Sequence, residues 1–123
     1  MPKPTLEFVA ADQVEWTRVP NGVEGLTERI LSLDEDTGVA TRMLRFAPGT
    51  DTSPAGVQRH PFWEEVYILE GSIRDLSVDQ TFTADMYACR PPGMPHGPWV
   101  SEQGCTTFEV RYTIQGNNSR QPN

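Results

Sequence analysis

The sequence predicts an all-β protein, a sandwich or a barrel, and three observations support this expectation. Eleven prolines and ten glycines are scattered along the 123 residues, so turn-forming residues cut the chain into short pieces. The pieces between them are rich in β-branched and aromatic residues, which favour strands. Only one short segment spaces its apolar residues as a helix would. Short strands between regular turn signals are typical of antiparallel sandwiches and barrels.

The first two candidate elements are residues 26–33, LTERILSL, and residues 39–47, VATRMLRFA. The apolar residues of the first have a helical spacing, but the segment also fits an imperfect strand, and we prefer the strand. The second is rich in residues that favour strands, and it ends at the turn signal Pro48-Gly49.

The next two candidates are residues 64–70, EEVYILE, and residues 72–78, SIRDLSV. Both are predicted as strands because Val, Ile, Leu and Tyr dominate them. Glu70-Gly71 is a turn signal between the two, and Asp79-Gln80 is another after the second. We therefore expect two separate strands that meet at a turn.

Strand 64–70 carries apolar residues on both of its faces. Alternation places Val66 and Ile68 on the side of Glu64, and Tyr67 and Leu69 on the other side. A strand covered on both sides in so small a protein indicates a second sheet on one side and a partner on the other. The pattern predicts a homodimer.

The last two candidates are residues 86–90, MYACR, and residues 105–113, CTTFEVRYT, with turn signals at 91–93 and 103–104. Alternation in the second places Glu109 and Arg111 together on one face. If that face looked into the barrel, Arg111 could bind a substrate carboxylate or enolate. We expect instead that it faces solvent.

Length and composition limit the organisation and the partners. We expect one domain over residues 1–123, with a core at about residues 20–115 and peripheral arms at 1–15 and 114–123. The formal net charge of −7 argues against nucleic acid and anionic membranes as partners. No apolar run approaches the roughly 18 residues of a membrane helix. The start lacks the apolar centre of a signal peptide, so we expect a cytoplasmic protein.

The two histidines of the chain stand in unusual settings. His60 precedes an apolar strand, with Glu64 four residues further on. If the backbone is extended there, Gln58, His60 and Glu64 point to one face. His96 lies in RPPGMPHGPW, where prolines stiffen the backbone and would hold an imidazole at a fixed place. Either histidine taken alone is more often an ordinary loop residue.

Taken together, these residues form a candidate metal site. Two histidines and one carboxylate with open positions are the ligand set of non-haem iron(II) oxygenases, and Gln58 would add a neutral oxygen. Imidazole also suits zinc, copper and nickel, and carboxylate and amide oxygens suit manganese. The ligand set, formed by Gln58, His60, Glu64 and His96, therefore restricts the metal without naming it.

The spacing of these residues follows two sequence motifs and resembles the cupin superfamily. The first cupin motif ends H-x-H-x3-4-E-x6-G, and here Gln58 takes the place of the first histidine in a run that ends at Gly71. The second motif is G-x5-P-x-G-x2-H-x3-N, and here Asp85 replaces its first glycine and Val100 its asparagine around His96. The resemblance spans about residues 38 to 113 and is closest to small single-domain cupins. Such cupins occur in acetylacetone-cleaving dioxygenases and in the zinc-binding cupin half of some anti-sigma factors, a likeness carried by DEDTGVATRMLRFAPGT and HPFWEEVYILEG.

The resemblance implies the double-stranded β-helix, or jelly-roll barrel, of the cupins. It further implies a divalent metal, with Fe²⁺ expected first and Zn²⁺, Mn²⁺ or Ni²⁺ as alternatives. The departure at Gln58 leaves open an altered metal preference or the loss of the metal. The departure at Asp85 requires its turn to avoid a positive φ or to strain that residue.

The function implied is that of a metal-dependent enzyme on a small diketone, enol or hydroxy-carbonyl compound, with dioxygenase-type cleavage expected first. Alternatives are a metal-dependent isomerase, cyclase or lyase, and a non-catalytic module that senses a ligand or a metal. His60, Glu64 and His96 are the candidate catalytic residues, and burial would raise the pKa of Glu64 toward that of a general base. The candidate substrate pocket consists of Phe62, Trp63, Met94, Trp99 and Arg111.

Overall fold

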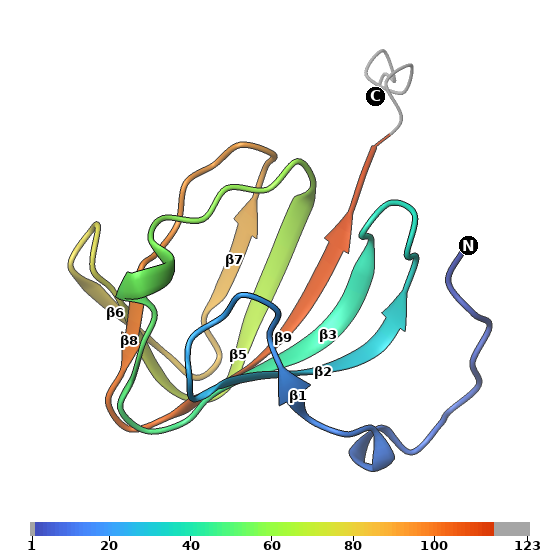
Figure 1. Ribbon diagram of the computed structural model, residues 1–123, viewed down its shortest axis with the longest axis horizontal. Helices are drawn as coiled ribbons and strands as arrows, with labels where there is room; N and C mark the ends of the chain where they lie inside the picture. Colours follow the sequence, from blue (N-terminus) through green and yellow to red (C-terminus); the bar gives the residue numbers. More distant parts are fainter. Residues whose placement is uncertain (1, 115–123) are drawn as a thin grey trace.

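The computed structural model describes residues 2–114, and within them the chain is almost entirely β-structure (Figure 1). No α-helix occurs in this range, which contains only the 3₁₀ turns η1 (Ala11–Gln13) and η2 (Ser53–Ala55). The all-β prediction is confirmed. The strands are β1 (Thr17–Arg18), β2 (Leu26–Leu33), β3 (Ala40–Phe46), β4 (Thr50–Asp51), β5 (Trp63–Asp75), β6 (Gln80–Thr83), β7 (Tyr87–Arg90), β8 (Trp99–Ser101) and β9 (Cys105–Tyr112).

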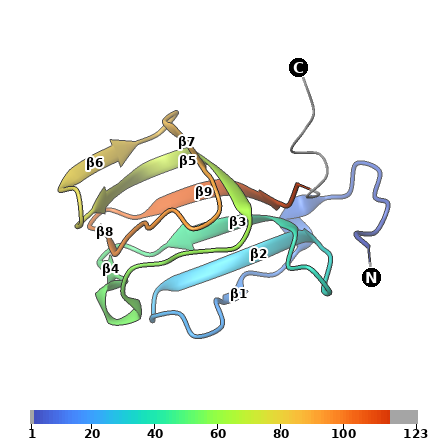
Figure 2. The same cartoon turned by 90° about the horizontal axis from the view of Figure 1, so that it is seen from above.

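The strands form one curled antiparallel sheet in the order β1-β2-β3-β9-β5-β8-β4, with β6 and β7 also paired to β5. The first half of β5 pairs with β9 and β7, and its second half pairs with β6 and β8. Figure 2 shows the two layers that result, with β5 passing from one to the other. The larger layer consists of β1, β2, β3, β9, β7 and the first half of β5. The smaller layer consists of β4, β6, β8 and the second half of β5, and together the layers make the jelly-roll barrel.

The prediction of a turn at Glu70-Gly71 is wrong, because β5 runs without interruption from Trp63 to Asp75. A bulge between Ile68 and Glu70 shifts the register there, and Gly71 continues the chain with φ +83°. The bulge also changes which residues face inward. Glu64, Val66 and Ile68 are buried before it, whereas Ile73 and Asp75 are buried after it. Both halves of one strand can therefore face the same interior.

The other predicted strands have mixed outcomes. Residues 26–33 form strand β2, and 39–47, 86–90 and 105–113 correspond to β3, β7 and β9. Of residues 72–78, only those up to Asp75 are in a strand, because a turn follows directly. Four short strands of two to four residues each, β1, β4, β6 and β8, were not expected.

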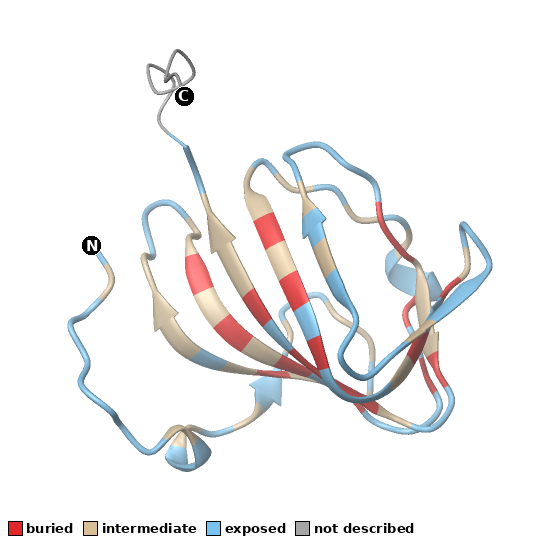
Figure 3. Ribbon diagram, turned by 180° about the vertical axis from the view of Figure 1, so that it is seen from behind, coloured by how far each residue is buried: buried red, intermediate tan, exposed pale blue. Residues whose placement is uncertain are grey.

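The core lies between the two layers and is hollow. Leu44, Phe46, Ile68 and Ile73 form the buried apolar cluster together with Cys105. Apart from Cys105, the same side chains line a cavity of about 1040 Å³. Figure 3 shows buried residues alternating with less buried ones along the central strands, as expected for a sheet with one face turned inward. Much apolar surface in this barrel therefore faces a cavity rather than other side chains.

The outward face of strands β5 and β9 is partly exposed in the single chain. Tyr67 is 40%, Leu69 44% and Phe108 36% exposed. The expectation that both faces of this strand are covered therefore holds for the inner face only, and the homodimer stays a prediction. No helix in residues 2–114 has the length and apolarity needed to cross a membrane.

The ends of the chain bear on the predicted arms. Residues 2–15 are largely exposed and form no strand. Of the predicted arm 114–123, residues 115–123 lie outside the described part of the chain. The single domain over 1–123 stays a prediction.

Candidate metal centre and its cavity

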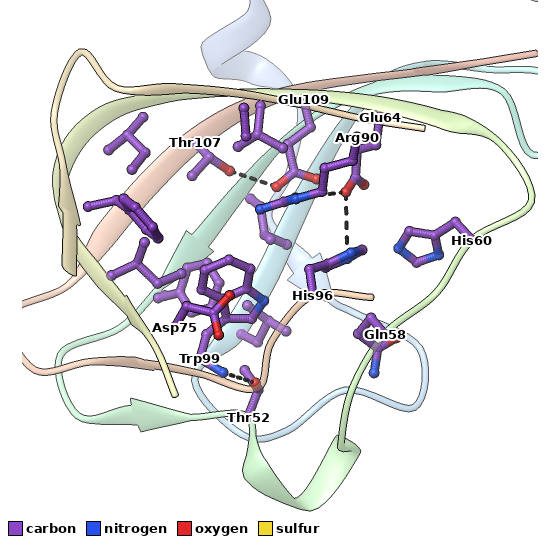
Figure 4. A pocket seen from close by; sticks show the side chains of 18 of the residues that line it. Thr52, Gln58, His60, Glu64, Asp75, Arg90, His96, Trp99, Thr107 and Glu109 are labelled. Atoms are coloured by element: carbon purple, nitrogen blue, oxygen red, sulfur yellow. Dashed lines mark hydrogen bonds and ion pairs between the residues drawn. The ribbon is translucent and has the colours of Figure 1, made fainter. Parts of the chain in front are cut away.

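Three side chains from separate segments meet at one wall of the cavity (Figure 4). His60 precedes β5, Glu64 is the second residue of β5, and His96 lies between β7 and β8. One donor atom from each can be chosen so that all three lie within 4.8 Å of one another. The ring centroids of His60 and His96 are 5.0 Å apart, and His96 Nε2 is 3.8 Å from Glu64 Oε1.

The backbone places these side chains by two different means. The peptide groups of Gln58 and His96 exchange two hydrogen bonds, of 2.8 and 3.0 Å, which tie the proline-rich segment to the approach of β5. The extended geometry expected from 58 to 64 does not hold, since the chain bends at residues 61 and 62. His60 is instead positioned by a stack on Phe62, with ring centroids 4.8 Å apart.

Gln58 lines the cavity, but its side-chain amide nitrogen bonds to the backbone rather than to a histidine. The residue is half-buried, and its side-chain Nε2 donates a hydrogen bond of 3.0 Å to the carbonyl oxygen of Ala55. Gln58 thus has a structural role through its backbone pair with His96. Its role as a metal ligand stays a prediction.

The donor set fits a divalent transition metal in type and nearly in spacing. Two imidazoles and one carboxylate form a facial triad with open positions. With metal–ligand bonds of about 2.1 Å, two ligands of one ion lie at most about 4 Å apart. The donor atoms of the three residues lie at most 4.8 Å apart, so side-chain shifts of about 1 Å would bring them all within bonding distance of one ion.

Glu64 is held by two arginines, a pairing that the sequence analysis did not predict. Arg111 Nε donates to Oε2 at 2.9 Å, and Arg90 Nη1 donates to Oε1 at 3.2 Å. Both arginines lie directly opposite Glu64 in the sheet, on β9 and β7 respectively. Three charged side chains therefore form one row across three neighbouring strands.

This row contradicts the expectation that Glu64 has a raised pKa. Burial does act to raise it, but the charge of Arg111 and the hydrogen bond that Arg111 donates are the main effects that lower it. The net pKa of Glu64 lies below its usual value. Glu64 is therefore a carboxylate at neutral pH and a poor general base.

The two histidines are kept neutral. Burial lowers the pKa of His60. Burial and the nearby charge of Arg90 lower the pKa of His96 to about 4, although Glu64 acts in the opposite direction. Neutral imidazole is the form that binds a metal. The environment thus prepares both rings as ligands.

The metal-free protein should lose stability as the pH falls from neutral. The unfolded chain binds a proton at His96 below a pKa of about 6.5, whereas the folded chain resists until about 4, so acid favours unfolding. Between about pH 7.5 and about pH 5, we expect a loss of about 2 kcal/mol in the free energy of unfolding, with His60 adding in the same direction. Urea titrations of the wild type and of His96→Gln measure it, and the variant should show a flatter profile. A wild-type profile flat over this range would contradict the buried, neutral His96.

The polar face of β9 looks into the barrel, so the expectation that it faces solvent is wrong. Glu109 is buried, and Arg111 reaches Glu64 inside the cavity wall. Glu109 accepts hydrogen bonds from Arg42 at 3.0 Å and from Thr107 at 2.9 Å. Arg42 also donates to Glu28 at 2.6 Å, which completes a buried triad of charges. Inward charges are tolerated because each has an oppositely charged partner.

The predicted pocket residues divide into three groups. Met94, Trp99 and Arg111 line the cavity. Phe62 lies behind His60 and contacts Arg111, whose Cζ is 4.9 Å from its ring centroid. Trp63 stacks on Tyr112, with ring centroids 6.3 Å apart, and is not among the lining residues.

Sequence reasoning missed Arg90. The alternation of side chains along the short strand could have found it. Ala88 and Arg90 are two residues apart and share one face, and both line the cavity.

A family model matches nearly the whole described chain. The model describes a ChrR cupin-like domain, and it matches residues 5–115. Among curated proteins, no relative was found.

Solved structures share the fold at low sequence identity. An RmlC-like cupin from Shewanella frigidimarina is 20% identical, and the match covers 92% of this chain and 96% of that protein with a TM-score of 0.67. An acetylacetone dioxygenase from Acinetobacter johnsonii is 17% identical, with 93% and 81% covered and a TM-score of 0.68. The polyketide cyclase RemF from Streptomyces resistomycificus is 23% identical, with 87% and 79% covered and a TM-score of 0.69.

Proposed function

The chain belongs to the ChrR cupin-like family, and on that premise we propose that it is a metal-dependent enzyme acting on a small organic substrate. The substrate would carry a diketone, enol or hydroxy-carbonyl group, and the reaction would be dioxygenase-type cleavage. One observation carries the proposal: donor atoms of His60, Glu64 and His96 lie within 4.8 Å of one another at the wall of a ligand-sized cavity.

The residues have separate roles in this proposal. His60 and His96 would hold the ion as neutral ligands, and Glu64 would supply the negative charge. A bound ion would act as a Lewis acid toward a carbonyl or enolate oxygen and, if it were iron, would give access to dioxygen chemistry. Trp99 and the apolar walls would hold the substrate body and exclude water from the reacting atoms. We propose Fe²⁺ first, with Zn²⁺, Mn²⁺ and Ni²⁺ as alternatives.

The arrangement favours this reaction over proton-transfer chemistry at Glu64. An isomerase, cyclase or lyase with Glu64 as its base needs a carboxylate that readily accepts a proton. The charge and hydrogen bond of Arg111 lower the proton affinity of that carboxylate. Such reactions would therefore need His60 or His96 as the base.

Metal content tests the site directly. Protein purified without added metal should contain about one divalent ion per chain, and His60→Ala and His96→Ala should each lower this at least about tenfold. Gln80→Ala is the control, because Gln80 lines the same cavity without belonging to the ligand set. Elemental analysis makes the measurement, and equal metal content in all four proteins would refute the site.

Oxygen consumption tests the chemistry. Iron-loaded protein should consume dioxygen when β-diketones are supplied, and His96→Ala should not. Bound iron without oxygen uptake on such a panel would refute the dioxygenase reaction. It would favour the non-catalytic sensing module, which the family match also accommodates.

Gln58→His separates the two roles of Gln58. If its side chain is a ligand, imidazole in its place should tighten divalent metal binding about tenfold or more, since imidazole is the stronger donor. Competition with a coloured chelator measures the affinity. Unchanged affinity would show that Gln58 serves only through its backbone pair with His96.

A further inference from the structure

We propose that the natural ligand of the cavity is an amphiphilic carboxylate, whose acidic group pairs with Arg90 and Arg111 and whose apolar body fills the hollow core. The inference rests on the proposed function in taking this ligand to be the substrate. Its support comes from the charges and the apolar walls of the cavity, neither of which requires a bound metal.

Positive charge exceeds negative charge around Glu64. Arg90 and Arg111 lie on either side of this one carboxylate and share it. Both guanidinium groups are largely withdrawn from solvent, with side chains 14% and 19% exposed. Burying a cation that lacks a full countercharge is costly, so the pair favours an added anion.

Each guanidinium also keeps donors free for a ligand. Arg90 donates to Glu64 only through Nη1, and Arg111 donates to Glu64 only through Nε. Within residues 2–114, neither arginine makes another hydrogen bond to a side chain or carbonyl group. Their remaining contacts are with ring faces, since Arg90 Cζ is 5.2 Å from the Trp99 centroid and Arg111 Cζ is 4.9 Å from that of Phe62. Guanidinium N–H groups match the geometry of a carboxylate.

Within residues 2–114, no other acid of the cavity wall forms an ion pair with Arg90 or Arg111. Glu109 is occupied by Arg42 and Thr107. Asp75 accepts hydrogen bonds from the backbone and hydroxyl of Ser77, and Figure 4 shows it beside Trp99, away from Glu64. Arg42 is shared by Glu28 and Glu109, so that triad carries a net negative charge that offsets the positive charge around Glu64 from a distance. Among residues 2–114, however, only Glu64 forms an ion pair with Arg90 and Arg111, so an added carboxylate can still pair with them directly.

The rest of the cavity is apolar and roomy. Val66 and Ile68 continue the wall along β5 from Glu64, and Phe82 and Trp99 line the cavity as well. The volume of about 1040 Å³ lies at the upper end of the range for small-molecule sites. A small polar anion such as acetate would leave these walls unfilled. A carboxylate with an aromatic or branched apolar body would pair with the arginines and also fill the space between the apolar walls.

The test compares three probes on the wild-type protein in the presence of a chelator. Calorimetry measures the binding of 3-phenylpropionate, of its neutral amide 3-phenylpropanamide, and of acetate. Charge-assisted pairing predicts that the acid binds about 10- to 100-fold more tightly than the amide. Acetate should bind more weakly than either. Equal affinity for acid and amide would overturn the proposal, and so would acetate binding as tightly as the acid.

Two variants then assign the effect to residues. Arg90→Gln should weaken binding of the acid about tenfold and leave the amide unchanged, while Arg111 still pairs with Glu64. Arg74→Gln is the matched control, because Arg74 is an exposed arginine of β5 that does not line the cavity. An equal effect of Arg90→Gln on both probes, or no effect on either, would overturn the assignment.

This experiment is independent of the proposed reaction. Because the chelator removes divalent metal, failure of the metal and oxygen tests would leave the binding result standing. Failure of the acid to outbind its amide would leave the metal site standing.

Discussion

Gly71→Ala is expected to lower the free energy of unfolding by about 3 kcal/mol or more. A methyl group there would overlap the carbonyl oxygen of Gly104 and lie 2.8 Å from Cys105 Cα, both of which are backbone atoms that cannot turn aside. The residue also has φ +83°, which costs a non-glycine residue about 1–2 kcal/mol. Crowding of a packed site typically adds about 1–3 kcal/mol. Urea unfolding followed by circular dichroism measures the loss.

Gly38→Ala separates the two contributions. Gly38 has nearly the same backbone angle, φ +81°, but nothing lies within 4 Å of an added methyl group. The Gly38→Ala variant should therefore lose only the free energy that the positive φ costs, about 1–2 kcal/mol. If both variants lost the same amount, the close approach of β5 to Gly104 would not limit stability.

The second large effect is expected at Arg42. Arg42→Met would leave Glu28 and Glu109 buried without their cation, with side chains 8% and 6% exposed. Removing one partner from a buried ionic group typically costs about 3–5 kcal/mol. The loss should shrink as the pH falls, because the cost comes from burying two negative charges without a cation and protonation removes those charges. Urea titrations at a series of pH values measure both effects.

Arg45→Met provides the control on the same strand. Arg45 is exposed, and its main contact is a stack on Trp16, with Cζ 4.0 Å from the ring centroid. Its loss should cost about 1 kcal/mol or less, with little dependence on pH. A similar cost at Arg42 would contradict the buried triad.

The sequence could predict strands but not how they bend. Composition placed β3 and β9 well, because Val, Ile and Thr mark strands wherever the sheet goes, but it divided β5 into two strands. Glu70-Gly71 has the composition of a hairpin turn and of a bulge alike. Which of the two forms depends on Gly104, a residue far along the chain against which Gly71 packs.

The site divides in the same way. His60, Glu64 and His96 could be selected from spacing, because motifs preserve the order of residues. The inward orientation of Glu109 and Arg111 could not, since a lone charge is expected at the surface. The decisive fact is the register, which sets Arg111 opposite Glu64 and Arg42 opposite Glu109. Single-sequence reasoning cannot fix such a register between distant strands.

The shared use of Leu44, Phe46, Ile68 and Ile73 has a consequence for how this protein can change. These side chains hold the layers together and also shape the space offered to a ligand. A replacement that reshapes that space also removes or adds core contacts, so new specificity is coupled to folding. Laboratory evolution toward other compounds should therefore accept changes first at Met94 and Gln80, which line the cavity but lie outside the core cluster.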